Sequence, residues 1–310
     1  MLKVNNLQKS YGDVRAVDGV SFEIAEGGVF GLLGPNGAGK TTAIHVLAQV
    51  IRPDSGSVTV DGLELGRDGS RVKGLIGFVP QELAIYHDLT ARENLAMFGK
   101  LYGLGGSELR GRVDEALEMV GLVDHARRRA KTFSGGMKRR LNIACGLLHH
   151  PKLLLLDEPA VGVDPQSRNF ILESIKKFNR ELGITILYTS HYMEEVEQLC
   201  ERAAIIDHGK IIADDTIEKL VAQHGGGSIV ITLDLDAVEA AAALAGKHGL
   251  GGATAEGKTL VLRADRPQQA LPGVLEFLNN RGLKIEGLEI MRASLETVFL
   301  NLTGRSLRDE

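Results

Sequence analysis

The chain has 310 residues, of which 44% are hydrophobic and 25% are charged, the ordinary balance of a globular protein. A net charge of −4 gives no reason to expect nucleic acid as a partner, and no apolar run approaches the roughly 18–20 residues that span a bilayer. Residues 1–6 lack the apolar region of a signal peptide, and Cys145 and Cys200 lack metal-ligand spacing, so we expect reduced thiols in a cytosolic protein.

This length is long for one hydrophobic core, so we expect two domains. The first covers residues 1–222 and opens with alternating apolar and polar residues over 1–28, typical of antiparallel strands. A helical subdomain is expected over about 84–150. The remaining elements expected in this domain are strands at 29–33, 57–60, 76–80, 153–156, 184–188, 203–206 and 210–213, and helices at 41–50, 91–102, 106–120, 136–149 and 166–182.

A glycine-rich stretch at 225–228 is the clearest linker, and it introduces a second domain at 226–310. Strands and helices alternate in this domain, and we consider one additional edge strand at 253–255. The order suggests a small α+β sandwich of the ferredoxin-like type. The elements expected are strands at 229–233, 259–262 and 283–290, and helices at 237–247, 271–280 and 294–302.

The most specific motif joins the strand at 29–33 to the helix at 41–50. Its spacing lets backbone N–H groups wrap a polyphosphate at a helix N-terminus, where the helix dipole favours negative charge. Lys40 can reach the β- and γ-phosphates, and the Thr41 hydroxyl can bind Mg²⁺. A plain glycine-rich turn would also join a strand to a helix, but the full spacing in this context favours a nucleoside triphosphate. The predicted binding residues are Gly34, Pro35, Asn36, Gly37, Ala38, Gly39, Lys40, Thr41 and Thr42.

Two acids end the apolar strand at 153–156. A carboxylate at the end of a buried strand beside a phosphate loop is where Mg²⁺ needs a second anchor, so Asp157 is the candidate ligand. Glu158 can act as the general base for a water in line with the γ-phosphate. The alternative is that both acids only begin a surface turn, and the phosphate loop earlier in the chain makes that reading the weaker one.

A second glycine motif precedes a helix that is rich in Lys138, Arg139 and Arg140. In it, Ser134 is a natural N-cap, and Gly135 and Gly136 let backbone amides approach a phosphate. The chain therefore contains a second anion-binding helix start, which cannot obviously serve the same phosphates as the first loop without a partner.

With these motifs in family order, residues 1–222 resemble the ATP-binding subunits of ABC transporters. Ser134, Gly135 and Gly136 look like the ABC signature, with Phe133 and Met137 in place of the commoner Leu and Gln. Residues 34–42 correspond to Walker A and 153–158 to Walker B. The resemblance implies the P-loop NTPase fold of an ABC cassette, in the α/β class, with a mixed sheet core, an antiparallel β subdomain and a helical subdomain.

Three further segments complete the resemblance. Residues 79–81 resemble the Q-loop, 163–165 the D-loop, and 189–191 the segment with the switch histidine. The family implies that Gln81 senses Mg²⁺ and the γ-phosphate, and that His191 contacts the γ-phosphate and holds the attacking water with Glu158. Tyr11 takes the place of the aromatic residue that stacks on adenine; its alternative role is a strand residue that packs on the small sheet.

The family also implies the partner cassette. Two copies, identical or related, would associate head to tail and sandwich two ATP molecules, so that the signature of one faces Walker A of the other. Hydrolysis would then let the copies separate, as a two-state switch.

The tail at 294–304 resembles the closing segment of cassettes that serve ABC-2-type exporters, including those for drugs and antibiotics. This implies a separate integral membrane permease, with the cassette peripheral on the cytoplasmic face of the cell membrane and residues 82–98 facing the permease. Residues 226–310 would be an accessory or regulatory domain. The rival class is a soluble ABC ATPase that acts on the ribosome or on DNA. Such proteins carry two cassettes, coiled coils or zinc inserts, and the sequence shows none of these features, which favours the exporter.

Overall fold

Two compact units make up the chain, Met1–Ile211 and Ile212–Glu310. The structure is a computed structural model and describes residues 1–224, 226–264, 266–291 and 293–303. Within these ranges, no helix is both long enough and apolar enough to cross a membrane. The predicted linker includes Gly225, which lies outside the described residues, whereas its last residue, Ser228, already belongs to a strand and is fully buried. The domains 1–222 and 226–310 stay a prediction.

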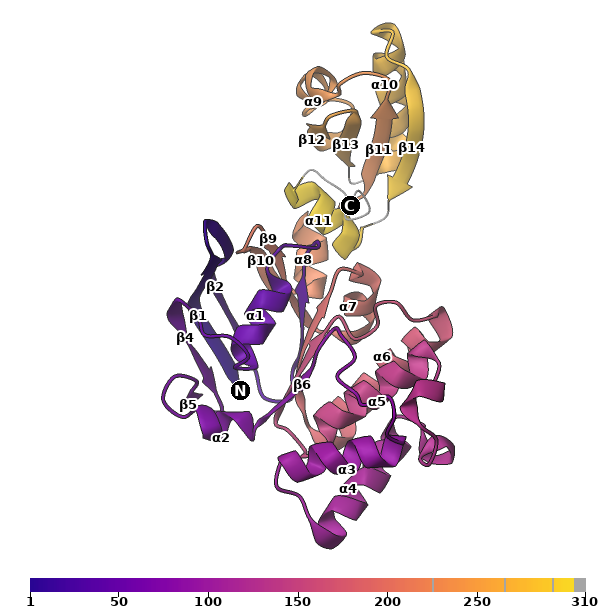
Figure 1. Cartoon of the computed structure of the whole chain (residues 1–310). Helices are drawn as coiled ribbons and strands as arrows, with labels where there is room; N and C mark the ends of the chain where they lie inside the picture. Colours follow the sequence, from indigo (N-terminus) through magenta and orange to yellow (C-terminus); the bar gives the residue numbers. More distant parts are fainter. Residues whose placement is uncertain (225, 265, 292, 304–310) are drawn as a thin grey trace. The chain divides into compact units, whose positions relative to one another are not determined.

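The first sheet of the first unit is four-stranded, and its neighbouring strands pair antiparallel (Figure 1). Leu2 pairs with Ile24 on one side and with Val60 on the other, and all three side chains are buried. Antiparallel strands over residues 1–28 are thus confirmed. In sheet order the strands are β2 (Val14–Ile24), β1 (Leu2–Tyr11), β4 (Ser55–Val60) and β5 (Leu63–Glu64).

The second sheet is six-stranded and carries the predicted motifs. Residues Leu153 to Leu156 are all fully buried, which explains the apolar run in the sequence. The strands β3, β7 and β8 are neighbours and run parallel, so that their carboxyl ends meet at one edge of the sheet. In sheet order the strands are β10 (Lys210–Thr216), in which the first unit ends, β9 (Arg202–Asp207), β3 (Val29–Leu33), β8 (Thr185–Ser190), β7 (Leu153–Asp157) and β6 (Ile76–Val79).

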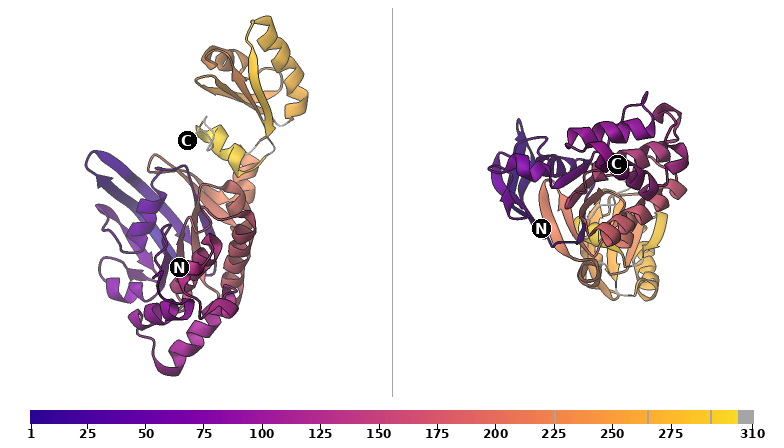
Figure 2. Two further views of the ribbon diagram at one scale, coloured as in Figure 1. Left: turned by 45° about the vertical axis from the view of Figure 1, so that its right-hand side comes forward. Right: turned by 90° about the horizontal axis from the view of Figure 1, so that it is seen from below.

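One helix of the first unit, α1 (Lys40–Leu47), contributes Ala43, Ile44 and Leu47 to a core that also contains side chains from both sheets. Figure 2 shows the four-stranded sheet and the α3–α6 helices at opposite sides of this unit. The helical subdomain predicted over 84–150 contains α3, α4 and α5. The other helices are α2 (Gly69–Lys73), α3 (Ala91–Leu101), α4 (Gly106–Met119), α5 (Gly135–Leu147), α6 (Pro165–Leu182) and α7 (Met193–Leu199).

Local sequence explains where the longer helices begin. The hydroxyl of Thr90 accepts a hydrogen bond from the Glu93 backbone N–H at 3.1 Å, and the Glu93 carboxylate accepts one from the Thr90 N–H at 2.8 Å, which is a capping box at the start of α3. Asp164 caps α6 by accepting from the Ser167 N–H at 2.9 Å, with Pro165 in the first turn, and Gly183 ends the helix at φ 64°.

The second unit contains an antiparallel sheet with the sequence order β-α-β-β-α-β, so the ferredoxin-like prediction is confirmed. The predicted edge strand at 253–255 is β12. Buried side chains of its strands and of α9 and α10 form one core. In sheet order the strands are β12 (Leu250–Glu256), β13 (Thr259–Ala264), β11 (Ser228–Leu233) and β14 (Ile285–Met291), and the two helices are α9 (Val238–Leu244) and α10 (Pro267–Asn280).

Two further helices of this unit pack against each other, α8 (Ile217–His224) and α11 (Leu295–Thr303). The Asn301 side chain donates a hydrogen bond to the His224 carbonyl at 2.7 Å. The tail whose sequence resembles exporter cassettes therefore ends in a helix, up to Thr303; its last residue, Gly304, lies outside the described residues.

Candidate nucleotide-binding site

The loop between β3 and α1 has the backbone that a phosphate cradle needs. Gly37 and Gly39 have φ angles of 77° and 108°, in the region that favours glycine. A Cβ on Gly39 would lie 2.2 Å from the carbonyl oxygen of Ala16, and one on Gly34 would lie 2.2 Å from that of Ile206. Glycine is therefore required here both for conformation and for close packing against neighbouring strands.

A pocket of about 220 Å³ opens at this loop. It brings most of the predicted phosphate loop together with Gln81 and Glu158, which come from distant parts of the sequence. Gly34, Pro35 and Ala38 do not line it. The lining residues are Ala16, Asn36, Gly37, Gly39, Lys40, Thr41, Thr42, Gln81 and Glu158.

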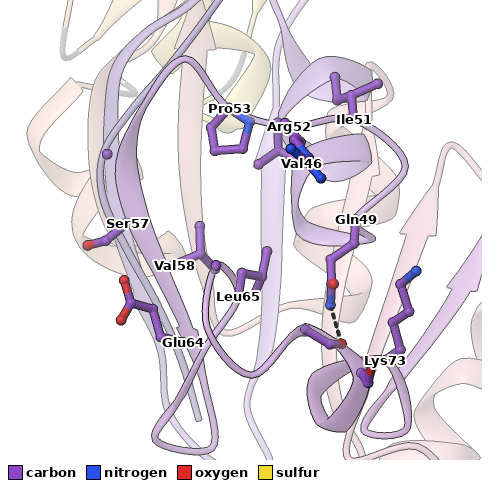
Figure 3. Close-up of a pocket in the computed structure, with 14 residues that line it drawn as sticks. Val46, Gln49, Ile51, Arg52, Pro53, Ser57, Val58, Glu64, Leu65 and Lys73 are labelled. Carbon is purple, nitrogen blue, oxygen red and sulfur yellow. Dashed lines mark hydrogen bonds between the residues drawn. The ribbon is translucent and has the colours of Figure 1, made fainter.

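A larger pocket of about 630 Å³ lies elsewhere in the same unit, between the end of α1, β4 and α2 (Figure 3). Its side chains include Gln49, Arg52 and Lys73, and Gln49 donates a hydrogen bond to the Gly69 carbonyl at 3.2 Å. None of the predicted site residues lines it, so volume alone does not identify the site.

Lys40 is buried, with 4% of its surface exposed. Its Nζ donates hydrogen bonds to the carbonyl oxygens of Gly34 at 2.7 Å and Pro35 at 2.9 Å, and lies 3.1 Å from Glu158 Oε1. The loop thus holds this ammonium in the lining of the pocket, with its charge compensated by a carboxylate and two carbonyl dipoles.

Glu158 contacts three other predicted residues of the site. Its Oε2 accepts a hydrogen bond from Gln81 Nε2 at 3.3 Å and lies 3.1 Å from His191 Nδ1, while Oε1 faces Lys40. Burial favours the neutral acid, but the hydrogen bond with His191 and the charge of Lys40 outweigh it, and the pKa of Glu158 is lowered. The surroundings therefore hold this carboxylate in its ionised form.

Asp157, the last residue of β7, is fully buried. Its Oδ1 accepts hydrogen bonds from Thr189 Oγ1 at 2.9 Å and from Thr41 Oγ1 at 3.3 Å. Its Oδ2 is buried and has no hydrogen-bond partner among the residues that the structure describes, and burial raises the pKa of this carboxyl despite the two hydroxyl donors. An orphaned carboxylate oxygen beside a threonine hydroxyl matches the oxygen donors that Mg²⁺ prefers.

The second glycine motif lies outside this pocket. Ser134 caps α5 by accepting a hydrogen bond from the Met137 N–H at 3.3 Å. Ser134 and Gly135 are exposed, whereas Gly136 is buried, and a Cβ there would lie 2.1 Å from Ser167 Oγ on α6. The motif is thus fixed against α6 and presents its first two residues to solvent.

Tyr11 lies at the end of β1 and is 52% exposed, with Lys9 Nζ 5.8 Å from its ring centroid. It is not among the residues that line the 220 Å³ pocket. Its predicted adenine contact stays a prediction.

Three residues in or beside the site have no individual role predicted from the sequence. Thr189 donates to Asp157 and also accepts a hydrogen bond from the Glu158 N–H at 3.0 Å; its position at the end of a strand, two residues before His191, is a readable signal. Glu195 is buried and accepts hydrogen bonds from Tyr188 at 2.8 Å and Ser190 at 2.7 Å. The third residue is Arg139, whose contacts are backbone carbonyls.

Known proteins match the chain over its whole length. A family model described as ABC transporter matches residues 17–161. The linearmycin resistance ATP-binding protein LnrL of Bacillus subtilis (strain 168) is 45% identical over 313 residues, covering 100% of each chain. The daunorubicin resistance ATP-binding protein DrrA3 of Streptomyces coeruleorubidus is 39% identical over 311 residues, covering 99% of this chain and 97% of that protein.

The fold also matches solved structures. The dimeric structure of a post-hydrolysis state of the ATP-binding cassette MJ0796, bound to ADP and Pi, has a TM-score of 0.63 and 28% identity; the match covers 70% of this chain and 98% of that one. Together with the phosphate loop, the two adjacent acids and the second glycine motif of this chain, these matches mean that the chain belongs to the ABC transporters, as an ATP-binding subunit whose ATPase powers transport.

Proposed function

We propose that the protein forms a dimer around two Mg²⁺-bound ATP molecules and that the hydrolysis of this ATP drives export through a separate membrane subunit. The observation that carries this proposal is the convergence of Lys40, Gln81 and His191 on the carboxylate of Glu158. Such a group can accept a proton from an attacking water while neighbouring donors hold it in place.

In this proposal the phosphate loop binds the β- and γ-phosphates through its backbone N–H groups and Lys40. Glu158 accepts the proton of the attacking water, and His191 and Gln81 keep the carboxylate and the water in line with the γ-phosphate. The buried position of Glu158, with 4% exposed, supports a base that is shielded from bulk water.

Thr41, Asp157 and Gln81 are the residues that would hold Mg²⁺. The orphaned Oδ2 of Asp157 and the Thr41 hydroxyl that is 3.3 Å from Oδ1 support this assignment. When bound, the cation would neutralise charge on the β- and γ-phosphates.

The signature supports the dimer. Ser134 and Gly135 are exposed at the start of α5, outside the pocket of the same chain, so their amides are free to meet a phosphate bound by a second cassette. ABC cassettes act as pairs, and MJ0796 is such a dimer. The second cassette would be another copy of this chain or a related one, with Tyr11 stacked on the adenine.

The direction of transport rests on the relatives. LnrL and DrrA3 are named for resistance to linearmycin and daunorubicin, and both match the chain over nearly its full length, including the second unit. Resistance through an ABC ATPase is what an efflux pump provides. We therefore assign the chain to an exporter with an ABC-2-type permease, on the cytoplasmic face of the cell membrane, and residues 226–310 to an accessory domain.

The test replaces Glu158 with glutamine, which keeps the side-chain shape and removes the proton acceptor. Hydrolysis should slow at least about a hundredfold, the scale of a lost general base, while ATP binding is retained. Glu194→Gln, an exposed carboxylate on α7, is the matched control and should turn over normally. Near-normal turnover in Glu158→Gln would remove Glu158 from this role.

Co-purification in detergent tests the membrane partner. An integral membrane protein should accompany the full chain. Ribosomes or DNA in its place would contradict the exporter and support the soluble class of ABC ATPases.

A further inference from the structure

Arg139 on α5 is buried, with 7% of its surface exposed. Its Nη1 donates hydrogen bonds to the carbonyl oxygens of Gln81 at 2.6 Å and Pro80 at 3.4 Å, and its Nη2 donates to that of Val161 at 3.3 Å. One side chain of the signature helix therefore holds the backbone of the segment that carries Gln81 and the loop that follows Glu158.

Asn142 lies one turn further along the same face of α5 and extends this contact. Its Nδ2 donates to the Pro80 carbonyl at 3.2 Å, and its Oδ1 accepts from the Ala84 N–H at 3.0 Å. The backbone is thus held on both sides of Gln81.

The chemistry of Arg139 suits this contact better than ordinary packing. Burial lowers the pKa of its guanidinium, and its hydrogen bonds in the described part of the chain run to carbonyl oxygens. A buried cation is unfavourable unless dipoles or charges compensate it. The planar guanidinium can reach several carbonyls that diverge, which a lysine ammonium on a flexible stem cannot do with the same geometry.

We propose that Arg139 is a positioning residue for Gln81. It fixes the backbone of Gln81 so that the side-chain Nε2 reaches Glu158 Oε2 at 3.3 Å, and it ties that segment to the helix that begins at Ser134. A displacement of α5 when the signature meets a nucleotide is thereby transmitted to the catalytic carboxylate. This inference rests on the roles of Gln81 and Glu158 in the proposed function.

The test is a double-mutant cycle on the full chain, with kcat and KM for ATP as the readouts. Arg139→Gln should lower kcat about tenfold and change KM by less than about threefold. In a Gln81→Ala background the same substitution should lower kcat by less than about twofold, because the residue through which Arg139 acts is already absent.

Arg140→Gln is the matched control. Arg140 is the next residue on α5, but its Nη1 donates to the Val120 carbonyl at 3.1 Å and its guanidinium lies 4.6 Å from the Phe170 ring centroid. Its removal should lower kcat by less than about twofold in either background. Arg139→Lys should recover only part of the lost kcat, since it restores the charge but not the geometry.

An equal loss of kcat from Arg139→Gln with and without the Gln81 side chain would overturn the proposal. If Arg139→Gln melts far below the Arg140→Gln control, Arg139→Gln is misfolded and cannot be used. Asn142→Leu, which removes the flanking hydrogen bonds at similar volume, then replaces it in the cycle. Its effect on kcat should likewise be smaller in the Gln81→Ala background than in the unaltered chain. Failure of the proposed function looks different: Gln81→Ala alone would turn over normally.

Discussion

Gly39, the residue before α1, is the position at which the phosphate loop touches the four-stranded sheet. Its φ of 108° is one that L-residues rarely adopt, and a Cβ there would lie 2.2 Å from the carbonyl oxygen of Ala16, a backbone atom of β2. Gly39→Ala should therefore destabilise the fold in two ways. The alanine would adopt a strained φ angle, and its Cβ would displace the backbone of β2.

Gly37→Ala separates these two costs. Gly37 has φ 77°, but a Cβ there would lie more than 4 Å from every neighbouring heavy atom in the described ranges of the chain. The dihedral strain should cost on the order of 1–3 kcal/mol at either position. The displaced Ala16 carbonyl should add about 1–3 kcal/mol to Gly39→Ala alone, the usual scale of overpacking.

Calorimetric melting of the full chain measures the difference. For a unit the size of Met1–Ile211, a free-energy loss of 1 kcal/mol lowers the melting temperature by about 2–4 °C, so Gly39→Ala should melt roughly 2–12 °C below Gly37→Ala. ATP affinity should fall in both variants, because both glycines line the pocket. Equal melting temperatures for the two variants would refute the argument that the loop is packed against β2.

Three further predictions concern the nucleotide. Lys40→Ala should abolish measurable ATP binding in a calorimetric titration, because the substitution removes the buried ammonium of the pocket, and undiminished binding would contradict the loop assignment. Ser134→Arg should leave ATP binding to the monomer intact and block ATP-driven dimerisation; analytical ultracentrifugation that still detects ATP-dependent dimers would show that the signature does not cross the interface. Tyr11→Ala should weaken ATP binding by about 1–3 kcal/mol, the scale of a lost base stack. An unchanged dissociation constant for ATP would favour the alternative role, in which Tyr11 packs on the small sheet as a strand residue.

Much of the fold could be predicted because turns and periodicity fix it locally. The strand Val29–Leu33 has the predicted bounds, since glycines flank it on both sides. The short elements were not predicted. A two-residue strand such as β5 and a five-residue helix such as α2 show no period, and the seven residues of α7 include three glutamates. One of these, Glu195, is buried by partners in β8, which the local sequence does not show.

In the candidate site, too, residues marked by local sequence could be predicted and residues placed by packing could not. Lys40 could be predicted because a strand, a glycine-rich loop and a helix follow one another directly there, and Asp157 and Glu158 because they stand at the end of an apolar strand. In the sequence, Arg139 stands out only as part of a basic helix. Its acceptors are backbone carbonyls of distant loops, and no residue type in those loops marks them; only the packing of α5 brings them within reach.

Glu158 has a backbone conformation that disfavours residues with a side chain. Its φ is 44°, a left-handed conformation that costs a residue with a side chain about 1 kcal/mol or more relative to glycine. Glycine or asparagine would relieve this strain, yet neither supplies a carboxylate. Selection for thermal stability alone would therefore favour replacement of glutamate at this position. Directed evolution of more stable variants should also screen for ATP hydrolysis, so that the carboxylate is kept.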